Sequence, residues 1–175
     1  SNLYAGLALN YKAFQDRMDL ASTVTDKREL VAMPGVYGDF RDSSLGGGLT
    51  SYSLAWSFGY LDIQTAEALA FDAATAQTDG LYSKLGYSAM RLQNVIGPIS
   101  LYVSVNGQCA FNNLDVSEEM ELGGMYAVRA YPEGEAYADE GYVLTAEARA
   151  RLPRLSARVP GQMHLVGLFD TGTVT

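Results

Sequence analysis

Hydrophobic and polar residues alternate over several stretches of the chain. In the first of these stretches, Leu3, Leu7 and Leu9 occupy one set of alternate positions, and Asn10 and Lys12 occupy the other. This period of two is typical of a β-strand with one apolar face, because successive side chains of a strand point to opposite sides. The pattern therefore predicts a strand that begins at Leu3 and has one polar face.

Residues 52–60 show the same alternation with larger side chains. The bulky positions are Tyr52, Leu54, Trp56, Phe58 and Tyr60. The positions between them are small or hydroxylated and carry no charge. Because the solvent side of a soluble strand normally carries charged or polar groups, we interpret the aromatic set as a lipid-facing stripe, with the core of a soluble sandwich as the alternative.

The longest alternation runs through residues 99–111. Ile99, Leu101, Val103 and Val105 share one face, which continues to Cys109 and Phe111, and Ser100, Tyr102, Ser104, Asn106 and Gln108 share the other. At about 3.3 Å per residue this strand is long enough to cross a bilayer at a tilt. It is also longer than the strands of most soluble proteins.

Four further stretches complete a prediction of seven long antiparallel strands. They are residues 30–40, in which Pro34 and Gly35 indicate a bulge or bend, 81–93, whose faces the pattern leaves unassigned, 142–152 and 162–170. In the last of these, Asp170 falls on the polar side. No segment shows a helical period, so the predicted fold class is all-β.

The predicted connections alternate in length. Residues 16–27, 62–79 and 112–139 form long connections, whereas residues 41–48, 94–98 and 153–160 form shorter ones. Long loops on one side and short turns on the other are typical of an outer-membrane β-barrel. The longest connection, residues 112–139, exceeds the usual length for a compact domain and therefore suggests a function.

Composition narrows the function classes. The chain has 175 residues and a net charge of -8, which argues against nucleic-acid binding. It contains one Cys and one His, so neither a disulfide nor a His-rich metal or catalytic cluster is expected. The chain contains no run of about 20 apolar residues, so no transmembrane helix is expected. We expect neither an enzyme, a metal site nor a cofactor.

The segment Leu122–Pro132 resembles the signature of two-partner secretion transporters, the haemolysin secretion/activation family. The matching positions are Gly123, Gly124, Val128, Arg129, Ala130, Tyr131 and Pro132, followed by an acidic and Gly-rich stretch. Ala130 departs from the Gly of the wider superfamily. Residues 107–115 and 168–172 also resemble family sequence, and the likeness is most specific over residues 107–172.

The resemblance implies a transmembrane β-barrel of sixteen strands in the outer membrane of a Gram-negative bacterium, preceded by two periplasmic recognition domains. Residues 1–175 would then be a fragment of the barrel domain that lacks those recognition domains. The loop that carries Arg129 is expected to fold into the lumen, where its guanidinium pairs with an acidic residue of the wall. Asp170 is the first choice as that residue and Glu147 is the second.

The expected function is a pore that exports, and thereby activates, a partner haemolysin or adhesin, without cofactor or nucleotide. The alternatives are a related barrel that assembles other outer-membrane proteins and a soluble β-sandwich binding domain. Outer-membrane lipid is an expected partner, and a fragment with open sheet edges is expected to self-associate. Glu118, Glu119, Glu121, Glu133 and Glu135 are interpreted as a solvated loop, with a calcium site as the alternative, and Asp170 could instead be a turn residue.

Overall fold

The computed structural model describes residues 1–18, 23–153 and 161–175. One antiparallel sheet of seven strands dominates it, in the order β1-β2-β3-β4-β5-β8-β9. The strands are β1 (Asn2–Met18), β2 (Thr23–Asp42), β3 (Gly48–Ile63), β4 (Gly80–Ile96), β5 (Ile99–Ala110), β8 (Gly141–Arg151) and β9 (His164–Val174). Each of these seven strands pairs with the next one in this order, which is also their order in the sequence, so the predicted antiparallel meander is confirmed.

The register collects the polar side chains on one face of the sheet. Ser53 on β3 lies opposite Ser88 on β4, and Ser88 lies opposite Asn106 on β5. Residues directly opposite each other point to the same side of a sheet, and the Ser53 and Ser88 hydroxyl oxygens are 2.7 Å apart. The register also settles the faces of β4: Lys84 and Ser88 lie on the polar face, and Leu85 and Tyr87 lie on the apolar face.

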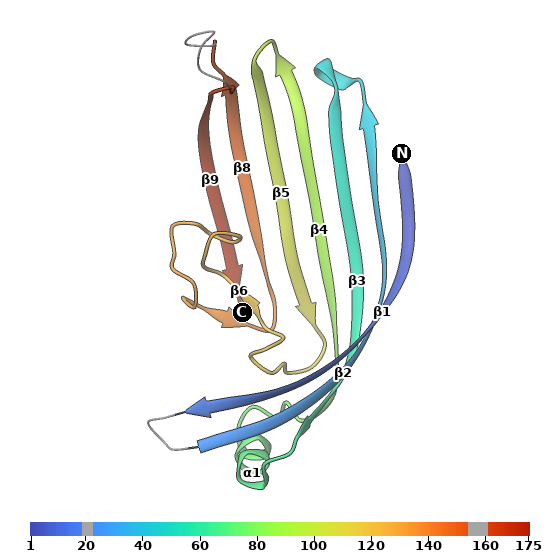
Figure 1. The fold of residues 1–175 in the computed structure, drawn as a ribbon, viewed down its shortest axis with the longest axis vertical. Coiled ribbons are helices and arrows are strands. Elements are labelled where there is room, and N and C mark those ends of the chain that lie inside the picture. Colours follow the sequence, from blue (N-terminus) through green and yellow to red (C-terminus); the bar gives the residue numbers. More distant parts are fainter. Residues whose placement is uncertain (19–22, 154–160) are drawn as a thin grey trace.

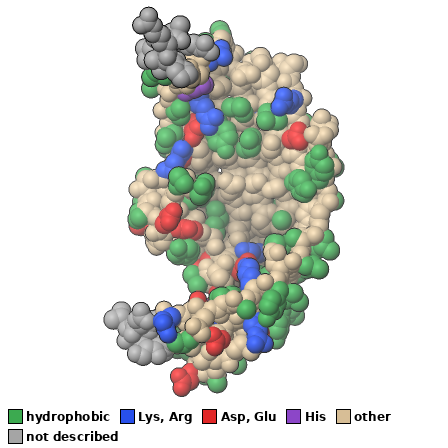
Figure 2. All heavy atoms as spheres, in the orientation of Figure 1, with side chains coloured by type: hydrophobic (Ala, Val, Ile, Leu, Met, Phe, Trp, Pro, Cys, Tyr) green, Lys and Arg blue, Asp and Glu red, His purple; other side chains and the backbone are tan. Residues whose placement is uncertain are grey.

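The sheet is curved (Figure 1). The polar face is the concave one, because Lys12 and Lys84 of that face pair with Glu118 of the connection between β5 and β8, which lies inside the curve. Figure 2 shows this hollowed face, in the middle of which backbone and uncharged side chains predominate. The long connection between β5 and β8 lies against the concave face, and it contains a second, two-stranded sheet of β6 (Met120–Glu121) and β7 (Tyr137–Ala138). The concave face is therefore both polar and partly covered by the chain's own loop.

The apolar face is convex and uncovered among the described residues. Trp56 is 42% exposed there, and its ring stacks on Phe58 and on Phe111, each at a centroid distance of 5.5 Å. Ile99, Leu101 and Val103 are exposed on the same face. The aromatic and aliphatic stripes are therefore not sealed inside a sandwich core, and the all-β fold has the form expected of part of a membrane barrel.

Of the two alternatives expected at Pro34 and Gly35, a bulge or a bend, the bulge is absent. Gly6 and Leu7 of β1 face these two residues in unbroken register, and the register with β3 is the same on both sides of Pro34. A proline lacks an N–H and interrupts a ladder locally without inserting a residue. The register shift lies instead between Asn94 and Ile96, next to the turn that joins β4 to β5.

Residues 16–27 are also not the long connection that the sequence suggested. Paired strands continue to Met18 and resume at Thr23, and Gln15 donates a hydrogen bond to the Asp26 side chain at 2.7 Å. These cross-strand polar contacts stabilise the hairpin beyond the apolar stripe on which the prediction was based. Residues 19–22, and residues 154–160 of the predicted connection 153–160, lie outside the described part of the chain.

A helix was missed in residues 62–79. Helix α1 (Ala66–Ala74) has nine residues, and a 3-10 turn, η1 (Ser44–Gly46), follows β2. The α1 segment is rich in Ala, which has a high helix propensity but leaves no polar and apolar period to detect. Asp72 fixes the following turn by accepting hydrogen bonds from the Thr78 and Asp79 backbone nitrogens. Among the described residues, no helix combines the length and apolarity required to cross a membrane.

Candidate functional site

The loop between β5 and β8 carries the signature segment. We call residues 112–139 the inner loop and residues 123–132 the loop tip. The pairing of β6 with β7 brings the two arms of the inner loop together, with Met120 opposite Ala138. Leu122 N donates to Ala136 O at 3.0 Å just beyond this pairing. The short sheet therefore presents the loop tip as a closed unit beside the concave face (Figure 1).

The Gly pair of the signature has a geometric reason at each position. A Cβ on Gly123 would lie 1.9 Å from the Pro132 carbonyl oxygen, so no other residue fits this close approach. Gly124 has φ +96°, in the left-handed region that favours glycine. Gly124 N donates to Tyr131 O at 3.0 Å. Together the two glycines let the loop tip fold back tightly on itself.

Val128 sets the direction of Arg129. Its side chain is 5% exposed, and its backbone N donates to Leu122 O at 2.9 Å. Tyr131 N donates back to Val128 O at 3.0 Å. Because Val128 is held inside this bend, the next side chain projects from it towards β8 and β9.

Arg129 binds a carboxylate on each of these two strands. Its Nε and Nη2 donate to the two oxygens of Asp170 on β9, at 2.7 and 2.8 Å. Its Nη1 donates to Glu147 Oε1 on β8 at 2.9 Å. A guanidinium that engages both oxygens of one carboxylate has a defined orientation as well as a favourable charge interaction. Arg129 therefore joins the loop tip to two adjacent strands of the sheet.

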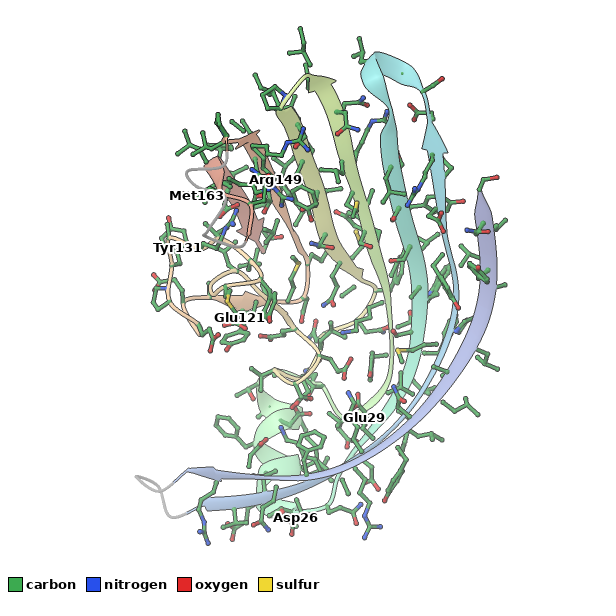
Figure 3. All side chains as sticks on the ribbon, turned by 45° about the horizontal axis from the view of Figure 1, so that its top comes forward. Asp26, Glu29, Glu121, Tyr131, Arg149 and Met163 are labelled. Carbon is green, nitrogen blue, oxygen red and sulfur yellow. The ribbon has the colours of Figure 1, made fainter. Side chains whose placement is uncertain are left out.

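The neighbouring groups support this arrangement. Arg149 donates to Glu147 Oε2 through Nε at 2.9 Å and through Nη2 at 2.7 Å. The Arg149 guanidinium also lies 4.9 Å from the centroid of the Tyr102 ring on β5, within cation–π range. Figure 3 labels Arg149 on the concave face, near the tip of the inner loop. Two arginines and two carboxylates thus form a set with balanced charge.

Burial is uneven across the set. The Asp170 side chain is 4% exposed and the Arg129 side chain is 32% exposed. The hydrogen bonds to Asp170, and then those to Glu147, raise the pKa of Arg129 above its ordinary value, so the guanidinium stays charged at every pH of interest. Because the arginine remains partly exposed, water can compete for its donors, and the contact is one that can break.

Asp170 is not a turn residue, which was the alternative interpretation of its sequence position. It lies within β9, opposite Thr145, on the face that also holds Glu147. Two positions further on, a Cβ at Gly172 would lie 2.9 Å from Leu122 Cδ1, so the small residue makes room for the inner loop. The other signature residues, Ala130, Tyr131 and Pro132, are exposed at the loop tip. Figure 3 labels Tyr131 on the side of the loop away from the sheet.

Sequence reasoning missed a second group of charged residues, where the inner loop leaves β5. Glu118 was interpreted as a solvated loop residue, but its side chain is 9% exposed and forms ion pairs with Lys12 and Lys84. Asp115 pairs with Lys27 in the same region. The signal available in the sequence was that Lys12 falls on the polar set of the first strand. Its partner lies 106 positions away, and alternation cannot identify a partner at that distance.

The comparisons with known proteins concern the family of the chain. The family model of the haemolysin secretion/activation protein ShlB/FhaC/HecB matches residues 40–175. The heme/hemopexin transporter protein HuxB of Haemophilus influenzae (strain Rd) is 28% identical over 154 residues, which cover 87% of this chain and 27% of HuxB. HuxB of strain 86-028NP is 29% identical over 157 residues, with the same coverage.

The chain therefore spans about a quarter of the length of these curated relatives. No solved structure matches it. The family match covers most of the chain, including every strand from β3 to β9 and the whole inner loop. The chain belongs to the haemolysin secretion/activation protein family ShlB/FhaC/HecB.

Proposed function

We propose that this chain forms wall strands and the inner loop of an outer-membrane pore that exports a partner protein of the haemolysin or adhesin type. On this proposal residues 1–175 belong to the barrel domain of a longer protein of a Gram-negative bacterium. The observation that carries the proposal is the attachment of Arg129 to Asp170 and Glu147, which holds a loop against the polar face of a curved sheet.

The two faces of the sheet suit a pore wall. The convex face presents Trp56, Leu101 and Val103 without cover, which suits contact with lipid hydrocarbon. The concave face presents serines, amides and paired charges, which suits water. Strand β5 has 12 residues, so at about 3.3 Å per residue it reaches across a bilayer at the tilt of barrel strands.

The inner loop suits a gate for a polypeptide. It lies on the concave face, where a closed barrel would have its lumen, and would narrow the path. Its tip is held by polar contacts, and water can satisfy the same groups after release. A loop tip held in this way can leave the path and return by exchanging these polar contacts for water. The proposed activity is passage of an extended chain through the pore, so it requires no catalytic group, metal or cofactor.

The family supports a protein as cargo. The family is named for secretion and activation of a haemolysin, and the HuxB relatives are named heme/hemopexin transporter proteins. The acidic balance of the chain, with 20 Asp and Glu against 12 Lys and Arg, does not favour nucleic acid as cargo. A secreted protein partner is therefore the substrate class that we propose.

The test is export of the partner by the full-length transporter with Arg129→Ala. We expect the barrel to assemble in the outer membrane, and the amount of partner in the culture supernatant to fall severalfold. Arg129→Lys keeps the charge but loses the bidentate geometry, and it should give an intermediate loss. Arg28→Ala is the matched control, because Arg28 lies on the other face of β2 from Glu29 and therefore on the face opposite the inner loop. Unchanged export with normal assembly of Arg129→Ala would contradict the proposal.

A further inference from the structure

The inner loop has a second attachment to the sheet, separate from Arg129. We call residues 112–119 the loop root. Leu114 of the loop root is 3% exposed and packs in a small apolar cluster with Val31 of β2 and Tyr82 of β4. Its backbone N also donates to Asp139 Oδ1 at 3.0 Å, at the far end of the inner loop. The loop root is therefore seated in the concave face and tied to the arm of the inner loop that returns to β8.

Glu118 joins the loop root to two strands that are not neighbours. It pairs with Lys12 of β1, and Lys84 of β4 lies 2.9 Å from its Oε2. The Glu118 backbone oxygen accepts a hydrogen bond from Lys84 Nζ at 2.6 Å and another from Gln108 Nε2 of β5 at 3.0 Å. β2 and β3 lie between β1 and β4. Glu118 therefore spans the curvature of the sheet from its concave side.

The groups behind Glu118 complete a balanced set of charges. Glu29 of β2 is 1% exposed and accepts a hydrogen bond from the Tyr82 hydroxyl. Its other oxygen, Oε2, has no well-aligned donor, but Lys12 Nζ lies 2.9 Å from it. Lys12 thus serves both Glu29 and Glu118. Withdrawing Glu118 would leave Lys12 and Lys84 with one carboxylate fewer between them, and the cost falls mainly on Lys84, whose side chain is 15% exposed, whereas that of Lys12 is 40% exposed.

A second ion pair is formed by the residue that follows Leu114. Asp115 pairs with Lys27 of β2, and it also accepts a hydrogen bond from the Ser117 hydroxyl at 2.8 Å. The side chain of Lys27 is largely buried, and Asp16 of β1 lies 2.8 Å from its Nζ. The loop root therefore contacts β1, β2, β4 and β5, whereas the loop tip reaches β8 and β9 through Arg129.

The two attachments differ in polarity and in burial. At the loop root the loop supplies carboxylates and the sheet supplies lysines, while at the loop tip the loop supplies an arginine and the sheet supplies carboxylates. The root also has an apolar residue inside the polar shell, and exposing it to water costs free energy in addition to that of the broken polar contacts. Figure 3 shows Glu29, which marks the root, well separated from Arg149, which marks the tip.

We propose that Glu118 is a positioning residue that keeps the loop root on the sheet while the Arg129 contact opens. Movement of the inner loop is then confined to the part beyond the root, and the released tip always returns from the same anchored point. This inference rests on the proposed function, because a loop that must open and close is of use to a transporter. It assigns to the loop root a role that the signature segment does not include.

The test measures uncovering of the root directly, in the full-length transporter. Val31 is 1% exposed beneath Leu114, so Val31→Cys, with Cys109→Ser to remove the native thiol, reports whether the root has lifted. The rate of maleimide labelling of this introduced thiol is compared for Glu118→Gln, Arg129→Gln and the matched control Glu119→Gln. Glu119 is adjacent and of the same type, and it forms no ion pair with any described residue.

We expect Glu118→Gln to raise the labelling rate of the introduced thiol severalfold, and Arg129→Gln and Glu119→Gln to leave it low. Equal rates for Glu118→Gln and Glu119→Gln would overturn the proposal, and so would rapid labelling in Arg129→Gln, because root and tip would then open together. If Glu118→Gln does not assemble, Lys84→Met decides in the same way, since it removes one partner and keeps Lys12. Labelling requires no cargo, so unchanged export by Arg129→Ala would contradict the proposed function and leave this result intact.

Discussion

Arg149 and Glu147 lie two positions apart on the same face of β8, and Arg149 Nη2 reaches Glu147 Oε2 at 2.7 Å. This contact leaves the other oxygen, Oε1, for Arg129 at 2.9 Å. Asp170, by contrast, gives both of its oxygens to Arg129. Glu147 therefore divides its charge between two arginines, while Asp170 serves the loop. The two carboxylates should then contribute unequally to holding the loop tip.

Asp170→Asn should release the loop tip more than Glu147→Gln does. The lost charge-assisted hydrogen bonds face water, so we expect a cost of about 1–2 kcal/mol for Asp170→Asn. That cost corresponds to roughly a tenfold rise in the released population. Release of the tip is measured as the distance between spin labels at Tyr131→Cys, which is exposed at the tip, and at Ser104→Cys on the concave face of β5, in a Cys109→Ser background. A distance distribution as broad in Glu147→Gln as in Asp170→Asn would contradict the unequal roles.

Gly123→Ala should disrupt the loop tip without harming the barrel. The added Cβ would lie 1.9 Å from the Pro132 carbonyl oxygen, so the backbone of the tip must shift. Overpacking of this kind costs about 1–3 kcal/mol. Gly167→Ala is the matched control, since nothing lies within 4 Å of a Cβ at Gly167. We expect reduced export for Gly123→Ala and normal export for Gly167→Ala, with equal amounts of both in the outer membrane; equal export would show that the tip tolerates the shift.

Alternation alone predicted most of the sheet, because one buried or lipid-facing side imposes a period of two on each strand. It identified seven strands and put Asp170 on the polar side of the last one, where the structure has it. The position of the inner loop did not come from alternation. It came from the resemblance around Gly123 and Arg129, since a loop carries no period of its own.

The features that were missed depend on tertiary contacts. Helix α1 forms in a stretch of Ala residues whose pattern contains no apolar stripe. The burial of Glu118 depends on Lys12 and Lys84, which lie on strands brought together only by the curvature of the sheet. A count of acidic residues in the loop could not distinguish Glu118 from Glu119. Local sequence therefore predicts the strands and their faces, but not which loop residues the folded sheet will bind.

Adjacent residues of β5 should respond in opposite ways to a positive charge. Val103 is 45% exposed on the convex face, whereas Ser104 lies on the concave face opposite Thr145. In a bilayer Val103→Arg should destabilise the barrel by about 2–4 kcal/mol near the membrane midplane, and Ser104→Arg should fold almost normally. Folding of the full-length protein into lipid vesicles, followed by the heat-dependent shift in gel mobility, measures both variants. Equal loss in the two variants would show that the convex face does not meet lipid.

The loop root should loosen in acid. Burial by itself would raise the pKa of Glu118, but the hydrogen bonds and charges of Lys12 and Lys84 lower it below its ordinary value of 4.5 overall. A carboxyl group with a lowered pKa contributes stability that is fully present above pH 4.5 and is lost as the pH falls through the lowered pKa. Glu29, which pairs with Lys12, and the Tyr82 hydroxyl, which donates to Glu29, belong to the same set of polar groups.

Hydrogen exchange of residues 112–119, corrected for the intrinsic pH dependence of exchange, measures this effect. We expect protection of the loop root to be constant from pH 7 down to about pH 5 and to fall below that, in line with the unfolded reference value for a glutamate. In Glu118→Gln the same residues should be less protected, with little further change in acid. A wild-type profile as flat as that of the variant would show that Glu118 does not hold the root.

The 175-residue chain by itself should associate in water. In the described sheet β1 and β9 are the two outer strands, and each pairs on one side. Unpaired strand edges favour pairing with further chains, and the uncovered stripe that includes Trp56 and Leu101 favours association through its apolar surface. We therefore expect size-exclusion chromatography with light scattering to show oligomers or aggregates in detergent-free buffer, and smaller species when detergent covers the stripe. Detergent does not pair with the free backbone N–H and C=O groups of the edge strands. Small oligomers that form by edge pairing should therefore remain after the apolar face is covered. A single sharp monomer peak without detergent would mean that the edges and the convex face are protected in a way that the described residues do not provide.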